Sequence, residues 1–417
     1  MRLFLAAGLI ASLSVAMYAT SKPAPKSVAK AVTVPATIDH NRIVIPVQLR
    51  LADGSMQSVR AWVDNGDPEL SMSRELASVL GLNVSCGEKE CSAPAPPEIV
   101  IDGMSFPLSE VKEAKVPLRP VTAATVLAQG MNAQINIPST ILRHYDVLVD
   151  FPESKVSIGT PGSIHFRGPS AKVQVNSGNG LIQVPSQIEG KKYSLSLDLG
   201  ASISFLSDDL FSKLATAHSD WPQMTGAVGS ANMWGLDEET KWRVMRLDRV
   251  QFGPLFLTNV PFVSIPTDMM DFFQKRAGMP IAGLIGSEVL TNYRVGFDYA
   301  HSTVYFDIGR LFNFPDFDVV GVVLRPEDDG RFTILGVANF DGRPSVEGVQ
   351  EGDHLVAVNG IPVHGMTMGQ IWSLLGGTPG QEKKLTVERD SKEFTITGKI
   401  QHFLAIAPDD TERKGKR

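Results

Sequence analysis

Apolar and polar residues alternate in short runs along most of the chain, which is typical of β-strands with one buried face. Two such runs, Ile43–Leu51 and Met56–Val63, flank the hairpin signal Asp53-Gly54. A helix is predicted over Ser73–Gly81, because a serine can cap its first turn and a glycine can end it. Many short strands with few helices predict a mainly β fold.

The stretch Tyr193–Ser207, which reads YSLSLDLGASISFLS, concentrates this pattern. An alternating run ends at Leu197, Asp198 follows at once, and a second apolar run begins at Ile203. Gly200 permits a tight turn between the two runs, since a residue with a Cβ would be strained there. The pattern predicts a carboxylate on a turn at the edge of a core, where Asp is seldom placed without a reason.

The same pattern occurs twice in the chain. Residues 60–80 align without a gap on residues 194–214, and residues 137–158 align without a gap on residues 285–306. The first block superposes Asp64 on Asp198, Gly66 on Gly200, Ser73 on Ser207, Leu76 on Leu210 and Leu80 on Leu214. The second block has identical residues at Ser139, Leu142, Tyr145, Val147, Asp150, Ser154 and Val156. A repeat of this length predicts two copies of one β-rich unit, each offering one aspartate.

The DLGAS motif resembles the Asp-Thr/Ser-Gly-Ala-Ser signature of aspartic peptidases, with Leu199 at the hydroxyl position. A helix, the segment GLIGSEVL at Gly283–Leu290 and then VGFDY follow in the order of that family. The chain resembles a bacterial two-lobed aspartic peptidase of the retropepsin or pepsin type over roughly residues 40–310. The resemblance implies two acid-protease-like β-barrel lobes, at residues 39–165 and 166–312.

The resemblance also implies a reaction and its residues. Asp64 and Asp198 would form a catalytic dyad that activates a water molecule to hydrolyse polypeptides, with no cofactor and no metal. Residues implied to support the catalytic loops are Asn65, Gly66, Leu199, Gly200, Ser202 and Gly286. Because the partner lobe lies in the same chain, a monomer is expected.

Several residues depart from the family pattern. Asn65 can still donate and accept hydrogen bonds where the family has a hydroxyl, whereas the Leu199 side chain can do neither. Asp67 adds a third negative charge beside the dyad, and Pro138 stands where the second copy has Gly286. Two alternatives stay open: an inactive pseudo-peptidase that binds peptides as a scaffold, and a dyad formed by Asp198 of two chains.

Residues 316–403 have a different pattern. Ser345–Gly360 reads SVEGVQEGDHLVAVNG, and a helix is predicted over Met368–Leu375. This part is similar to the PDZ domain of bacterial envelope proteases, an α+β module. The resemblance implies a groove for a C-terminal peptide, lined by Gly321, Val322, Val323, Leu324 and Ile371. The alternative is a PDZ-like module used only for packing.

The ends of the chain predict targeting and flexibility. One arginine followed by an apolar run and small residues predicts a secretory signal peptide at residues 1–19, with an uncleaved membrane anchor as the alternative. A flexible linker is expected over residues 20–38 and a disordered tail over residues 404–417. A periplasmic or secreted protein follows, with membrane contact only if the leader is retained.

Composition narrows the remaining choices. The chain has 417 residues, of which 43% are hydrophobic and 20% charged, so it can bury large cores. A net charge of −6 without a basic stripe argues against binding nucleic acid. The two cysteines, Cys86 and Cys91, are expected to form a disulfide in an oxidising compartment. The repeated Asp150 and Asp298 are interpreted as structural, and Trp221–Trp242 as either a loop over a cleft or a plain surface loop.

Overall fold

The computed structural model describes residues 30–51, 53–88, 90–117, 132–310, 317–340 and 342–405. The expected signal peptide, the first part of the expected linker and nearly all of the expected tail lie outside these residues. The described chain is mainly β, as predicted. Among the described residues no helix is long and apolar enough to cross a membrane.

A six-stranded sheet joins the two copies of the repeat. Its strands are, in spatial order, β1 (Ala31–Pro35), β12 (Lys155–Gly159), β11 (Asp146–Asp150), β22 (Tyr293–Asp298), β23 (Thr303–Ile308) and β13 (Ser170–Lys172). At its centre Leu148 pairs with Gly296, and the sequence repeat superposes these same two residues. Equivalent residues face each other in this way where a pseudo-twofold axis crosses an antiparallel pair of strands.

The same symmetry accounts for residues 31–35, which were wrongly predicted to be part of a flexible linker. Residues 31–35 are strand β1, which pairs with β12, just as β13 pairs with β23 in the second copy. Val32 and Val34 are buried in the core, whereas the alternate positions of this strand are exposed. The expected linker of residues 20–38 therefore includes an edge strand of the central sheet.

The first copy forms a sheet in which the buried residues alternate along β3. The sheet contains β10 (Ile135–Pro138), β4 (Met56–Asp64), β3 (Arg42–Arg50), β7 (Glu98–Ile101) and β8 (Met104–Pro107), with β2 (Thr37–Asp39) beside β3. A smaller sheet contains β5 (Ser85–Cys86), β6 (Cys91–Pro94) and β9 (Glu113–Val116). The helices are α1 (Arg74–Val79) and α2 (Ser139–Leu142). The predicted disulfide Cys86–Cys91 joins β5 to β6.

The second copy forms a larger sheet that curls until β15 also pairs with β19. Its strands are β14 (Gln174–Val175), β15 (Ile182–Ile188), β16 (Lys191–Leu197), β21 (Gly283–Ile285), β17 (Ser204–Ser207), β20 (Leu255–Ile265), β19 (Arg243–Phe252) and β18 (Gln223–Thr225). Its helical elements are α3 (Asp208–Ala217), α4 (Thr267–Ala277), and the 3-10 helices η1 (Gly229–Ala231), η2 (Asp237–Thr240), η3 (Ser287–Val289) and η4 (Tyr299–His301). Ser73 and Ser207, superposed by the repeat, cap α1 and α3 in the same way.

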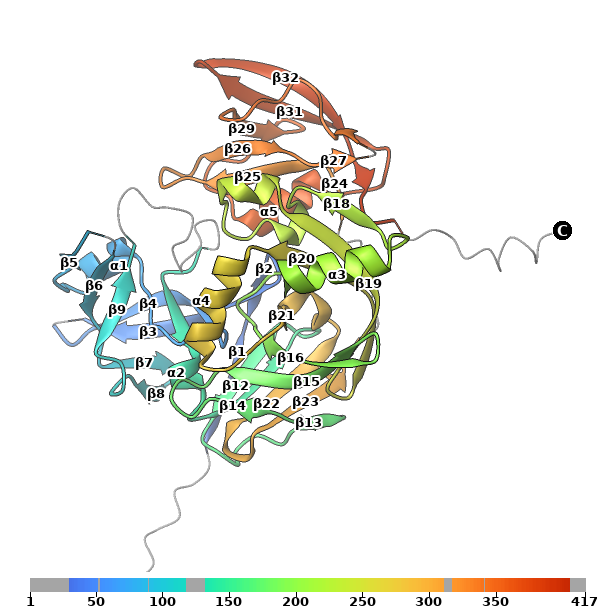
Figure 1. The fold of residues 1–417 in the computed structure, drawn as a ribbon. Helices are drawn as coiled ribbons and strands as arrows, with labels where there is room; N and C mark the ends of the chain where they lie inside the picture. The colour runs from blue at the N-terminus through green and yellow to red at the C-terminus, as the bar shows by residue number, and fades with distance from the viewer. Residues whose placement is uncertain are drawn as a thin grey trace, which may run out of the picture.

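The C-terminal module, residues 317–405, lies against the second copy at the top of Figure 1. Its main sheet contains β25 (Val322–Pro326), β26 (Phe332–Val337), β29 (His354–Val358), β31 (Glu382–Arg389) and β32 (Lys392–Lys399), with β30 (Ile361–Pro362) beside β29. The other elements are β24 (Asp318–Val319), β27 (Asn339–Phe340), β28 (Arg343–Pro344), β33 (Gln401–His402) and α5 (Met368–Leu375). Thr225 of β18 pairs with Asn339 of β27, so the sheet of the second copy continues into the module.

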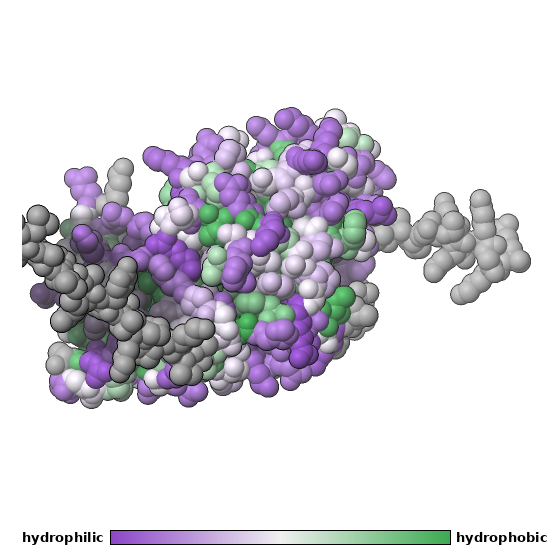
Figure 2. Space-filling model, turned by 90° about the horizontal axis from the view of Figure 1, so that it is seen from below, coloured by the Kyte–Doolittle hydropathy of each residue, from purple (hydrophilic) through white to green (hydrophobic). Residues whose placement is uncertain are grey.

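The module has no separate core of its own. Its buried residues form one hydrophobic cluster with Phe205, Val228, Met233 and Val263 of the second copy. On the face of the molecule seen in Figure 2, by contrast, apolar side chains lie in small areas among polar ones. The module and the second copy therefore share one core.

Candidate active site

Two equivalent loops carry the predicted aspartates. Strand β4 ends at Asp64, and Asp198 follows the end of β16. Asp64 Oδ1 accepts hydrogen bonds from the backbone N–H groups of Gly66 (3.0 Å) and Asp67 (3.1 Å). Asp198 Oδ1 accepts from the two equivalent N–H groups at 2.7 and 3.1 Å. Each loop therefore fixes its own carboxylate with the same pair of backbone bonds.

The two loops face each other closely. A Cβ added to Gly66 would lie 2.1 Å from Cγ of Asp198, and a Cβ added to Gly200 would lie 2.3 Å from Oδ1 of Asp64. Each aspartate thus packs against the glycine of the opposite loop, at a distance that no larger residue permits. The structure brings together the two carboxylates that the sequence repeat singled out.

Asn65 joins the two loops. Its Nδ2 donates to the carbonyl oxygen of Leu197 (3.1 Å), and its Oδ1 accepts from the N–H of Leu199 (2.7 Å). The Leu199 side chain is fully buried in the core and makes no polar contact. One side chain from the first copy therefore makes both bonds across the interface, and a hydroxyl at Leu199 is not needed for them.

The loops are supported from behind by equivalent serines. The N–H of Ser139 donates to the carbonyl of Asp67 (2.8 Å), and the N–H of Ser287 donates to the carbonyl of Ala201 (2.9 Å). The N–H of Gly286, which Pro138 lacks, donates instead to Ser204 Oγ. The proline therefore does not remove the bond that supports the first loop.

Two other predicted support residues lie where space is tight. A Cβ on Gly286 would lie 2.6 Å from the backbone of Ile203, so a larger residue does not fit there. Ser202 is fully buried in the second loop, and its carbonyl accepts from Nδ2 of Asn41 (3.0 Å). Both residues act on the loop through packing and backbone contacts.

The electrostatic surroundings differ between the two carboxyls. Asp64 is buried, and burial together with the charges of Asp198 and Asp67 raises its pKa well above the usual range. Asp198 is partly exposed. Burial also raises its pKa, but the loop N–H groups and the cations Arg42 and Arg276 act in the opposite direction. Burial therefore raises the proton affinity of both carboxyls, and the pair can share one proton.

Arg42 is a residue near the dyad that the sequence did not single out. It is 2% exposed, lies over the Trp62 ring (5.5 Å to the centroid), and donates from Nη2 to the carbonyl of Met233 (3.0 Å). Burial lowers its pKa to about 10, against the opposing charges of Asp64 and other acids. Arg42 directly precedes the predicted strand Ile43–Leu51, and an arginine at the end of a strand is ordinarily expected to be exposed.

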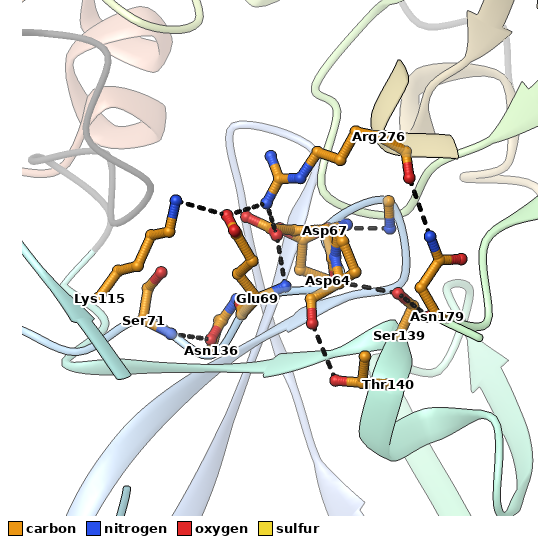
Figure 3. Close-up of polar contacts among 12 residues, drawn as sticks. Asp64, Asp67, Glu69, Ser71, Lys115, Asn136, Ser139, Thr140, Asn179 and Arg276 are labelled. Atoms are coloured by element: carbon orange, nitrogen blue, oxygen red, sulfur yellow. Dashed lines mark hydrogen bonds and ion pairs between the residues drawn. The ribbon is translucent and has the colours of Figure 1, made fainter. Parts of the chain in front are cut away.

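An alternating row of charges reaches the first loop (Figure 3). The guanidinium of Arg276, at the end of α4, contacts the carboxylates of Asp67 and Glu69. Glu69 also pairs with Lys115 (2.9 Å). Burial raises the pKa of Asp67 to about 6, and Arg276 acts to lower it. The third negative charge predicted beside the dyad is therefore paired with an arginine from the other copy.

The predicted peptide groove of the C-terminal module is covered by the chain itself. The covering part, residues 226–242, is called the covering segment below. The N–H of Leu324 donates to Oδ1 of Asn232 (3.0 Å), and Arg325 pairs with Asp237 (2.8 Å). The predicted groove residues Val322, Val323, Leu324 and Ile371 are fully buried. Gly321 also packs closely, since a Cβ there would lie 2.3 Å from Ser345 Oγ.

The covering segment also contacts His40 and Arg42 of the first copy. The carbonyl of Gly229 lies 3.0 Å from Nε2 of His40, and the carbonyl of Met233 accepts from Arg42. Trp234 stacks on Phe205 of β17. The interpretation of Trp221–Trp242 as a plain surface loop is wrong, because residues 226–235 are almost all buried. Its other interpretation, as a loop over a cleft, stays a prediction. The covering segment is packed between the C-terminal module and the two copies of the repeat.

Among the described residues, no group of three or more His, Cys, Asp or Glu side chains is arranged to hold a metal ion. Asp150 pairs with Arg294 (2.9 Å), and Asp298 caps the 3-10 helix η4. Both repeated acids outside the dyad therefore have structural partners.

Comparison with known proteins bears mainly on the second copy. Residues 184–289, which include the Asp198 loop and Gly286, match a family model described as aspartyl protease. The crystal structure of an aspartic proteinase from Irpex lacteus is similar at 11% sequence identity and a TM-score of 0.37, over 67% of this chain and 98% of that chain. A search of curated proteins found no match. The part of the chain around Asp198 is thus similar to aspartyl proteases.

Proposed function

We propose that this protein is an aspartic endopeptidase that cuts polypeptides with Asp64 and Asp198. The observation that carries the proposal is the reciprocal packing of each aspartate against the glycine of the opposite loop. Such an arrangement keeps two carboxyls at one site and lets them share a proton. The aspartyl protease match of residues 184–289 supports the same class of reaction.

The expected reaction uses one carboxylate as base and one carboxyl as acid. Asp198, whose carboxylate form is favoured by the loop N–H groups and by Arg42 and Arg276, takes a proton from a water molecule as the water oxygen adds to the peptide carbonyl carbon. Asp64 gives its proton to the carbonyl oxygen. As the C–N bond of the tetrahedral intermediate breaks, the amine nitrogen takes the proton from Asp198. The carboxyl product then returns a proton to Asp64.

Digestion of casein or a peptide library at about pH 4–6 tests this proposal. We expect cleavage by the wild-type protein, and a loss of at least about 100-fold in kcat/KM for Asp64→Asn and Asp198→Asn. Asp209→Asn is the matched control, because Asp209 is an exposed acid in the first turn of α3. It should cleave as the wild type does.

An inactive pseudo-peptidase is the competing function. It is favoured by Asp67 and Pro68, which replace the small residues of the second loop, and by the near-complete burial of Asp64. If the folded wild type cleaves nothing between about pH 3 and 8 while still binding peptides, the endopeptidase proposal is wrong. The scaffold function would then replace it.

We further propose that the C-terminal module is of the PDZ type and that its groove recognises peptides. The support is that residues of α5 and β25 belong to one hydrophobic cluster, together with the Leu324 N–H of β25, which bonds to a side chain, Asn232 of the covering segment. A peptide ligand would have to displace that segment. We expect a C-terminal peptide that binds to change the fluorescence of Trp234, and Asn232→Ala to bind it more tightly. If a bound peptide leaves the Trp234 signal unchanged, it binds elsewhere.

We also propose a periplasmic or secreted location, with a monomeric protein. The apolar leader in residues 1–19 and the disulfide Cys86–Cys91 support export to an oxidising compartment. The pairing of the two aspartate loops within one chain supports the monomer, because no second chain is needed to complete the dyad. Fractionation of cells and light scattering of the purified protein test the two statements.

A further inference from the structure

We propose that Arg276 is a positioning residue for the dyad. By pairing with Asp67 it offsets the charge next to Asp64 and ties the first aspartate loop to the second copy of the repeat. This inference rests on the proposed function, and it assigns a role to two residues that lie outside the paired aspartates.

The contacts of Arg276 come from one copy and reach the other. Arg276 belongs to the last turn of α4, and its guanidinium contacts both Asp67 and Glu69, the latter at 2.7 Å (Figure 3). The side chains of Arg276 and Asp67 are only 16% and 9% exposed. Charges this deeply buried are screened little by salt, so the pair acts strongly on neighbouring charges.

The end of α4 is itself held in place. The carbonyls of Arg276 and Ala277 accept from the side-chain amides of Asn179 (2.9 Å) and Asn176 (2.7 Å). The carbonyl of Asn179 in turn accepts from Oγ of Ser139 (2.7 Å). Ser139 is the residue whose N–H supports the first loop, so α4 and that loop belong to one hydrogen-bonded network.

The charge of Asp67 bears directly on Asp64. Its N–H donates to Asp64 Oδ1, so the two residues lie in the same tight loop. An unpaired carboxylate at Asp67 would repel the negative charge of the dyad and raise its proton affinity. Arg276 offsets that repulsion and lowers the pKa of both Asp64 and Asp198.

Other charged groups face this region and enter the balance. Glu69 and Lys115 face Asp67 on the outer side of the row. Arg42 of β3 acts on Asp198, and Arg42 is itself acted on by the charges of Asp39 and Glu239. The Lys115–Glu69 pair and Arg42 are retained when Arg276 or Asp67 is substituted, whereas Glu69 loses its contact with Arg276 in both variants that lack the arginine.

The test is a double-mutant cycle on the pH profile of kcat/KM. In Arg276→Gln, loss of the guanidinium charge that lowers the pKa of both dyad carboxyls should move the acidic limb up by about one pH unit. In Asp67→Asn, the lone charge of Arg276 should move the same limb down. The double variant should return close to the wild-type profile. Arg294→Gln, which breaks the matched arginine pair with Asp150 in the central sheet, should leave the limb in place.

A purely structural role would lower kcat without moving the limb in opposite directions. Shifts of the same sign in the two single variants, or no shift, would overturn the inference. If Arg276→Gln does not fold, the downward shift expected of Asp67→Asn decides alone.

Carbon-13 titration of the aspartate carboxyls by NMR gives a readout that needs no turnover. If the wild type cleaves nothing, the proposed function fails, but opposite shifts of the Asp64 and Asp198 titrations in the two variants would still support the role of Arg276. Unchanged titrations would overturn it whether or not the protein is active.

Discussion

In the first copy of the repeat the aspartate loop reads Asp-Asn-Gly-Asp-Pro, and in the second it reads Asp-Leu-Gly-Ala-Ser. The backbone bonds of the two loops are nonetheless equivalent, down to the serine N–H that supports each from behind. The side chains of the two loops contribute unequally to the contacts between the loops. Asn65 makes both bonds across the interface, whereas Leu199 only fills the core. Symmetry of the backbone can therefore persist after symmetry of the side chains has been lost.

A second difference lies in the chain that follows each capped helix. After α1, a short hairpin is closed by the disulfide Cys86–Cys91. After α3, the covering segment is organised around the buried carboxylate of Glu239, which accepts from Asn232 and from the N–H of Trp234. The buried residues of this segment belong to the same hydrophobic cluster as those of the C-terminal module, whereas Cys91 of the disulfide hairpin belongs to the other cluster. Among the described residues, therefore, the segment after the capped helix is packed with the C-terminal module only in the second copy.

The largest effect should come from Asn65→Ala. It leaves the N–H of Leu199 and the carbonyl of Leu197 buried without partners, which costs about 1–3 kcal/mol for each group. We expect urea denaturation to show the loss in the free energy of unfolding, and kcat/KM to fall with it. Asn65→Thr, with a hydroxyl that can accept and donate once each, should recover part of both. An alanine variant as stable as the wild type would mean that the hydrogen bonds between the two loops contribute little to the free energy of unfolding.

The next largest effect concerns Glu239. Burial raises its pKa from 4.5 to about 7, so its contribution to stability is present below the lower value and is lost as pH rises through the higher one. The full difference is roughly 3 kcal/mol. We expect the Tm of the wild type to fall across this range and the fall to be smaller in Glu239→Gln.

Glu238→Gln is the control for this pH dependence, because Glu238 is the exposed neighbour of Glu239. Its Tm should follow the wild-type curve. If the Tm of Glu239→Gln falls with pH as steeply as that of the wild type, the covering segment is not organised by a buried acid. The contrast with the disulfide hairpin would then be unsupported.

Much of the fold could be predicted because it depends on local patterns that occur twice. The alternation of β3 and β4, the serine caps of α1 and α3, and the helix α5 all lie close to where the sequence predicts them. The paired aspartates were also found from the repeat. Two glycines with the same spacing from an acid are a signal that a single sequence can carry.

The rest depends on contacts between residues far apart in the chain. Strand β1 was expected as linker, since its pairing with β12 has no local signal beside the lysines and prolines around it. Arg276 and Arg42 look like ordinary surface cations in the sequence, and only the folded chain places them near the dyad. Val322, Val323 and Leu324 were predicted to be open to a peptide from their own sequence, but they are buried, and the Leu324 N–H bonds to Asn232 from a distant part of the chain.

A smaller effect is expected for Leu199→Thr, which places a hydroxyl on this side chain. The N–H of Leu199 already bonds to Asn65, so the hydroxyl gains no role there and is buried in an apolar core. We expect a loss of about 1–3 kcal/mol in the free energy of unfolding and no gain in kcat/KM. Leu199→Val is the control, because valine has nearly the same shape as threonine but lacks the hydroxyl. If the threonine variant is the more stable of the two, its hydroxyl has found a partner, and the second loop is less committed to packing than we infer.

The smallest effect should come from Pro138→Ala. Proline differs from the equivalent Gly286 in lacking an N–H, but that N–H bonds to Ser204 in the second copy and not to the aspartate loop. The bond that supports the first loop comes from Ser139, which is unchanged in the variant. We expect a loss of at most about 1 kcal/mol, from the greater freedom of the unfolded chain, and an unchanged kcat/KM. A marked change in activity would mean that the proline shapes the Asp64 loop directly, and that the two copies differ in their backbone support as well as in their side chains.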